Sequence, residues 1–240
     1  MRKGMELPIK SNTNVLTKTE KMAKALHRAV ITASQNKYGV KVTPEEVYTI
    51  AVGEGFNRYL LNYYLQESST DSSLSGFRTL GTDVIGSEVA VLKSGGFVSG
   101  SLNVQPQTET NEKGEKVTSG YFNNMQDGLE AAAGTIAFRK YLFLRDLKSF
   151  GVEPSTLTRQ QMNFWLYLYF NPGPGFAKVQ LRKYVQDGKL NDKNYITARP
   201  NEKVQNGRIG RDNAIIRAVM METMYELGVL NLPGYSDSYR

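Results

Sequence analysis

The sequence predicts a mainly α fold with one small β element. Three observations support this fold class. In most segments apolar residues recur at helical spacing. Capping residues stand before several of these segments. The sequence has no internal repeat, so a repeat architecture is not indicated. Only residues 94–120 are rich in glycine and polar residues with scattered apolar ones, as in a hairpin or mobile flap. The helices therefore outnumber the strands.

The N-terminal part predicts two helices. We expect residues 1–16 to form an irregular arm and residues 17–240 a single domain. Residues 17–35 carry apolar residues at helical spacing, and His27 lies among lysines and arginines, where we expect a surface residue. Residues 43–46 (TPEE) then combine a capping threonine, a proline for the first helical position and a capping-box glutamate. This second helix is predicted to run to about residue 65.

The middle of the chain is expected to hold loops, a short helix and the β element. Residues 67–79 form a polar loop rich in serine, threonine and aspartate, and residues 80–86 (LGTDVIG) follow it. A short helix is predicted around residues 87–93, before the glycine-rich segment.

Four further helices are expected in the second half. One runs over about residues 124–150, and Thr158 with Gln161 caps an aromatic helix that closes at residues 170–175 (FNPGPG). Two prolines and two glycines cannot continue a helix, so the chain turns there and restarts at Pro174. After a polar loop to residue 211, the last helix is predicted to start at residue 212 and to bury Ile215, Ile216, Val219, Met220, Met224 and Leu227.

The composition excludes several kinds of chemistry. The chain has no cysteine and one histidine, which excludes disulfides, thiol catalysis and cysteine-based zinc sites, and leaves too few histidines for a histidine zinc site. A catalytic triad built on His27 is also not expected. We therefore expect no metal and no cofactor, and an enzyme that works through carboxylates, tyrosines or amides.

The charge favours an anionic partner. Net charge is +7 and the isoelectric point is near 9.4, but the basic residues are spread over the chain without a run of like charge or a recognition motif. We therefore expect no nucleic-acid partner. No apolar run approaches the roughly 18 residues of a membrane span, and the basic first residues lack the apolar stretch of a secretory signal. The expected protein is made in the cytoplasm and delivered by another route.

Glu54 is the residue with the clearest chemical potential. It falls on the apolar stripe of its predicted helix, between Gly53 and Gly55. Burial disfavours the charged form of a carboxylate, so the pKa of Glu54 is expected to rise, which suits a general acid near neutral pH. Alternatively, Arg58 stands four residues further along the helix and would pair with Glu54, which would lower that pKa.

Four segments together resemble a known family. Residues 50–57 (IAVGEGFN), 80–86 (LGTDVIG), 122–133 (FNNMQDGLEAAA) and 170–175 (FNPGPG) are similar, in chain order, to motifs of soluble lytic transglycosylases and goose-type lysozymes. The resemblance covers roughly residues 43–186 and implies a lysozyme-like helical domain.

The chain departs from the family pattern at three points. Gly55 replaces a serine, Thr82 and Asp83 replace a Met-Gln pair, and Phe170 replaces a tyrosine whose hydroxyl lies near the catalytic glutamate in the family. Residues 187–240 fall outside the resemblance, as a helical extension without an assigned role.

The resemblance implies cleavage of the β-1,4 bond after N-acetylmuramic acid in peptidoglycan glycan strands, with Glu54 as general acid. Asp83, and then Asp71, are candidates for a second carboxylate; a transglycosylase needs none, because the substrate's acetamido group takes part. The expected substrate-binding residues are Gly81, Thr82, Tyr167, Tyr169, Phe170 and Asn171. Such a protein acts on the bacterial cell wall. The alternative is a non-catalytic wall-binding or structural component of a phage tail or injection particle with the same fold.

Overall fold

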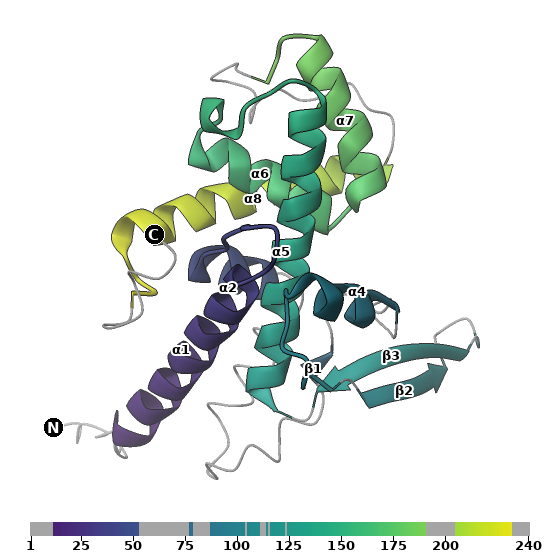
Figure 1. Ribbon diagram of the computed structural model, residues 1–240. Coiled ribbons are helices and arrows are strands. Elements are labelled where there is room, and N and C mark those ends of the chain that lie inside the picture. Colours follow the sequence, from purple (N-terminus) through teal and green to yellow (C-terminus); the bar gives the residue numbers. More distant parts are fainter. Residues whose placement is uncertain are drawn as a thin grey trace, which may run out of the picture.

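A computed structural model describes residues 12–52, 77–78, 87–103, 105–110, 114, 116–122, 124–190 and 205–231. The prediction of a mainly helical fold is confirmed (Figure 1). The described elements are α1 (Asn12–Ser34), α2 (Pro44–Ala51), β1 (Phe77–Arg78), α4 (Ser87–Gly95), β2 (Gln105–Thr110), β3 (Lys116–Phe122), α5 (Met125–Ser149), the short 3₁₀ helix η3 (Pro154–Thr156), α6 (Arg159–Phe170), α7 (Pro174–Gln186) and α8 (Gln205–Leu227).

Helix α5 is the centre of the fold. It packs against α1, α2, α6 and α7, and α6 and α7 lie near its C-terminal end while the sheet lies near its N-terminal end (Figure 1). The segment after α4 approaches α5 closely at Gly134, which has no side chain. A Cβ atom at this position would stand 2.8 Å from the carbonyl oxygen of Phe97. The segment after α4 therefore packs directly on the backbone of α5.

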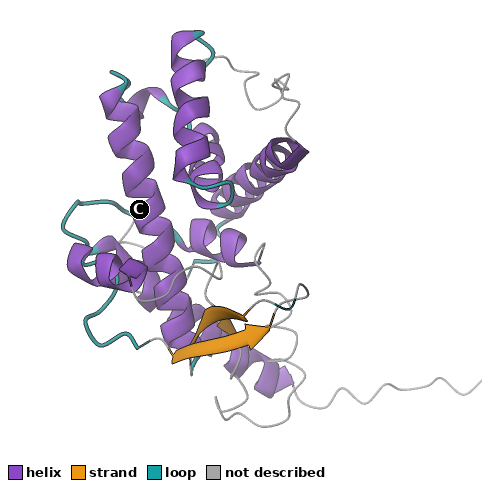
Figure 2. Cartoon of the chain, turned by 90° about the vertical axis from the view of Figure 1, so that its right-hand side faces the viewer, coloured by secondary structure: helices purple, strands orange, loops and turns teal. Residues whose placement is uncertain are grey.

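The described strands form one antiparallel sheet in the order β1-β3-β2. Gln105 pairs with Tyr121 and Thr110 with Lys116, and Phe77 pairs with Phe122 on the other edge of β3. The sheet lies on one side of the helical body (Figure 2). Phe122, the last residue of β3, is buried. The end of β3 therefore contributes an aromatic side chain to the core just before α5 begins.

The two predicted capping boxes and the predicted start of the helix near residue 124 are confirmed. Thr43 and Glu46 form a complete capping box at α2, and Thr158 and Gln161 form one at α6. Asn124 caps α5 by accepting a hydrogen bond from the Asp127 backbone N–H at 2.8 Å. These local hydrogen bonds satisfy backbone donors that have no partner within the helix.

Two helices begin earlier than predicted. Helix α1 starts at Asn12, inside the expected arm, and Val15 extends the apolar spacing of Met22 by two turns. Helix α8 starts at Gln205, inside the expected polar loop, although Gly207 and Gly210 lie in its first turns. A glycine costs a helix only about 1 kcal/mol relative to alanine, which does not stop this 23-residue helix.

The predicted buried face of α8 is wrong at four of its six positions, whereas Ile215 and Met224 are half-buried. Its buried residues are Ala214, Ala218 and Met221, which lie on one stripe. The larger residues that the prediction placed inside are exposed on the helix surface: Ile216, Val219, Met220 and Leu227. Helix α8 packs against α6 and α2, and alanines at this contact allow the axes to approach more closely than isoleucine or valine would.

His27 is a core residue, which corrects the expectation of a surface residue. Only 1% of it is exposed, and its Nε2 donates a hydrogen bond to the Leu230 carbonyl at 2.7 Å. Burial lowers the pKa of His27, and the Leu230 carbonyl and the nearby Glu45 act in the opposite direction. The histidine thus ties α1 to the turn that follows α8.

Candidate functional site

The predicted site is only partly within the described residues. Glu54, the two candidate carboxylates Asp71 and Asp83, the residues Gly81 and Thr82, and the alternative partner Arg58 all lie outside them. The described part consists of the C-terminal end of α6 and the turn to α7, which hold Tyr167, Tyr169, Phe170 and Asn171.

Tyr169 faces the buried carboxylate of Asp146, which pairs with two half-exposed basic side chains. It is fully buried, and its hydroxyl donates a hydrogen bond to Oδ2 of Asp146 at 3.1 Å. The other carboxylate oxygen of Asp146 accepts hydrogen bonds from Lys178 and Arg145, each at 3.1 Å. Burial and the neighbouring Asp146 charge raise the pKa of Tyr169 well above its usual range. Its hydroxyl therefore joins α5, α6 and α7, and no surface of it is open to a ligand.

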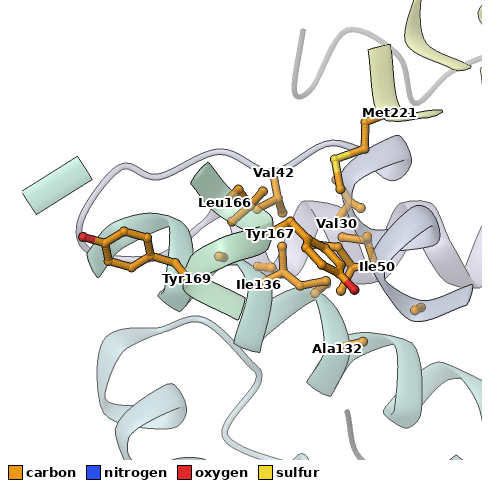
Figure 3. Packing of buried hydrophobic residues seen from close by; sticks show 14 of the residues in the cluster. Val30, Val42, Ile50, Ala132, Ile136, Leu166, Tyr167, Tyr169 and Met221 are labelled. Atoms are coloured by element: carbon orange, nitrogen blue, oxygen red, sulfur yellow. The ribbon is translucent and has the colours of Figure 1, made fainter. Parts of the chain in front are cut away.

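Tyr167 points the other way from α6. Its ring is directed toward Ile50 of α2 and belongs to the same buried cluster (Figure 3). The Asn171 side chain donates a hydrogen bond from Nδ2 to the Tyr167 hydroxyl at 2.9 Å. Tyr167 is buried, whereas Asn171 is exposed and Phe170 is half-buried. Of the four described residues, Phe170 and Asn171 have surface that a ligand can reach.

The turn after α6 has the rigid form that its prolines and glycines predict. Asn171 ends α6 as its C-cap, Gly173 adopts a φ of 93°, and Pro174 is the first residue of α7. A φ of this sign is strained for residues with a Cβ atom. The backbone therefore holds Asn171 at a defined corner, one turn beyond Tyr167.

A concave site, which sequence reasoning missed, lies where α2, α5, α6 and α8 come together. It is a cavity of about 370 Å³, lined by Thr43, Glu46, Lys140, Leu157, Arg159, Met162, Asn163, Met221 and Tyr225. The signal in the sequence was Asn163, a single amide inside the apolar run of the aromatic helix. The position of Asn163 in the sequence gave no indication of which other helices would face this residue.

The ion pair of this cavity is nearly buried. Nζ of Lys140 lies 2.7 Å from Oε1 of Glu46, and their side chains are 14% and 7% exposed. Oε2 of Glu46 accepts the Thr43 backbone N–H at 3.0 Å. Both oxygens of this carboxylate are therefore satisfied, which is the condition under which a buried pair is tolerated.

Other site classes receive no support from the part of the chain that the structure covers. Those residues contain no group of three or more histidine, aspartate or glutamate side chains placed to hold a metal ion. None of their helices is long and apolar enough to cross a membrane. Comparisons with known protein families, with curated proteins and with solved structures found no match.

Proposed function

We propose that the chain is a peptidoglycan-cleaving glycosidase, a muramidase or a lytic transglycosylase, with Glu54 as the general acid. The observation that carries the proposal is the relation between α2 and the end of α6. Tyr167 is directed toward Ile50 (Figure 3), and Ile50 stands four residues before Glu54 in the sequence. Segments that resemble two separate family motifs thus each contribute a side chain to the same buried cluster.

The proposal gives the two tyrosines and the turn different roles. Phe170 and Asn171 are the sugar contacts, because they have accessible surface. Tyr167 supplies a hydroxyl one helical turn before Phe170, the residue that replaces the family's tyrosine. Asn171 donates to this hydroxyl, which fixes both side chains. Tyr169 has a structural role through Asp146. Asp83 and Asp71 remain the candidates for a second carboxylate.

The test compares wild type with Glu54→Gln on purified peptidoglycan, with released fragments analysed by mass spectrometry. Glu20→Gln is the matched control, because Glu20 is an exposed residue paired with Lys24 on the surface of α1. We expect wild type and the control to release soluble fragments and Glu54→Gln to release at least 100-fold less, the usual scale of general acid catalysis (about 10²–10⁴-fold). Anhydro ends would identify a transglycosylase, and reducing ends a hydrolase.

A folded wild type that releases no fragments from its native wall type would overturn the enzymatic proposal. If that protein still sediments with peptidoglycan, the non-catalytic wall-binding role is the correct one. Release that is equal in wild type and Glu54→Gln would remove Glu54 from the mechanism.

A further inference from the structure

The cavity between α2, α5, α6 and α8 has more positive than negative groups in its lining. Its volume of about 370 Å³ lies within the range of small-molecule sites, roughly 300–1,000 Å³. Two basic side chains, Lys140 and Arg159, and one acidic side chain, Glu46, line it. One positive charge therefore remains, and a ligand with a single negative charge would neutralise it.

Arg159 is the cation of this cavity that has no acidic partner in the described part of the chain. Its guanidinium carbon lies 3.4 Å from the centroid of the Tyr225 ring, so the guanidinium stacks on the face of the ring. Stacking leaves the N–H donors in the guanidinium plane unused, and no described residue forms an ion pair with them. Arg159 is exposed, so a ligand can reach these donors.

The position of Arg159 at the start of α6 also favours an anion beside it. Arg159 is the first residue of the helix, and the first turn contains no acidic residue. The helix dipole places partial positive charge at this end, which stabilises anions and disfavours cations. The first turn of α2, by contrast, contains Glu45 and Glu46. An anion bound at Arg159 would supply the negative charge that α6 lacks.

Lys140 adds hydrogen-bond donors to the same lining. An ammonium group has three N–H donors, and the described residues supply one acceptor for them, Oε1 of Glu46 at 2.7 Å. The Lys140 side chain is only 14% exposed, so water has limited access to it. An acceptor on a ligand in the cavity would satisfy donors that the described protein groups leave without a partner.

Glu222 compensates Arg159 only in part. Burial raises the pKa of Glu222, although Arg159 acts in the opposite direction. Burial thus favours the neutral form of this carboxyl group. Glu222 is also not among the residues that line the cavity, so a ligand at Arg159 does not have to displace it.

We propose that this cavity binds a small monocarboxylate, whose two oxygens accept hydrogen bonds from the Arg159 guanidinium and whose short apolar part packs on Met162 and Met221. The planar guanidinium matches a carboxylate with two parallel hydrogen bonds. A doubly charged phosphate would instead leave excess negative charge beside Glu46. Two sources carry the required group, namely a free short-chain carboxylic acid and the C-terminal carboxylate of a short peptide.

This site is distinct from the proposed glycan site. Arg159 is the first residue of α6 and Asn171 is its C-cap, and 12 residues correspond to about 18 Å along a helix. The cavity and the turn that holds Asn171 therefore lie at opposite ends of α6. The inference does not rest on glycan cleavage, and each proposal can fail alone.

The test is a titration of the full ¹⁵N-labelled chain, followed by amide chemical shifts, with butanoate in one arm and N-acetylalanine in the other. Butanamide and N-acetylalaninamide are the neutral controls, because each replaces only the carboxylate. We expect saturable shifts at residues 157–163 and 221–225, with a dissociation constant on the order of 1 mM for ligands of this size. The carboxylate that saturates at lower concentration identifies the source.

Two variants with opposite expected effects test the charge argument. Arg159→Gln should weaken carboxylate binding about 10-fold or more, because the charged hydrogen bonds are lost. Glu46→Gln keeps a residue that can close the capping box but removes the negative charge, so it should tighten binding about 3-fold or more. Arg182→Gln is the matched control, since Arg182 also lies over an aromatic ring, that of Phe150 on the far side of α6 from the cavity lining, and it should bind like wild type.

Four results would overturn the inference. They are the absence of saturable shifts around Arg159 in wild type, equal affinity for the carboxylates and their neutral amides, and unchanged affinity in a folded Arg159→Gln variant. Tighter binding of inorganic phosphate than of either carboxylate is the fourth, because it would assign the site to a different anion. Peptidoglycan release by wild type and Glu54→Gln is measured separately and bears only on the proposed catalysis.

Discussion

Replacing Tyr169 with phenylalanine tests whether this residue is structural. The change removes the hydroxyl that donates to Asp146 at 3.1 Å and leaves the fully buried ring in place. A hydrogen bond to a charged group contributes about 1.5–3 kcal/mol. Lys178 and Arg145 still contact the other oxygen of Asp146, so we expect a loss of about 2 kcal/mol. For a chain of 240 residues, that lowers the melting midpoint by about 4–8 °C.

The effect should also depend on pH in a defined direction. The pKa of Tyr169 is raised in the folded state, while an unfolded tyrosine titrates near 10. Above that pH the unfolded chain loses the proton first, so the contribution of Tyr169 is complete below pH 10 and falls as the pH rises. The difference in unfolding free energy between wild type and Tyr169→Phe should therefore shrink by about 1.3 kcal/mol from pH 9 to pH 11.

Urea unfolding followed by circular dichroism at pH 7, 9 and 11 measures both effects. Tyr38→Phe is the control: Tyr38 is 43% exposed and stacks on Tyr141, and its substitution should change stability by less than about 0.5 kcal/mol. Equal stability of wild type and Tyr169→Phe at pH 7 would refute the reasoning. If Tyr169→Phe bound glycan more weakly than wild type but unfolded with the same free energy, Tyr169 would instead be a substrate-binding residue.

Two further predictions concern His27 and Gly173. The pKa of His27 is lowered in the folded state, so as the pH falls below about 6.5 the unfolded chain binds the proton before the folded chain does. In urea titrations between pH 7.5 and 5, the unfolding free energy of wild type should therefore fall more steeply than that of His27→Gln. Parallel pH profiles of the two proteins would contradict this prediction. Gly173→Ala should cost about 1–2 kcal/mol, because its φ of 93° strains a residue with a Cβ atom. Gly175→Ala, inside α7 with open space around it, is the matched control and should be neutral or stabilising, and equal midpoints for both variants would contradict the strain argument.

The starts of α2, α5 and α6 were predictable because their causes are local. The hydrogen bonds of Thr43 with Glu46, Thr158 with Gln161 and Asn124 with Asp127 join residues three apart. Residue types at these spacings therefore determine where α2, α6 and α5 begin. The turn at Gly173 and Pro174 was predictable for the same reason.

The buried face of α8 and the cavity were not predictable in this way, because they depend on which helices meet. Hydrophobic spacing on α8 favoured Ile216 and Val219 as core residues, but close packing against α6 selects Ala214 and Ala218 instead. Lys140 and Glu46 are 94 residues apart in sequence, and His27 and Leu230 are 203 apart. No local pattern indicates such pairs.

The contact between His27 and Leu230 has a consequence for synthesis of the chain. The two residues are 203 positions apart, and α2 packs against α8 as well as α1. At roughly 5–20 residues per second, a ribosome needs about 10–40 seconds between them. During that interval the face of α2 that α8 covers has no partner from its own chain. Completion of this part of the fold must wait until α8 has been made, so the nascent protein is expected to be a client of chaperones that shield apolar surface.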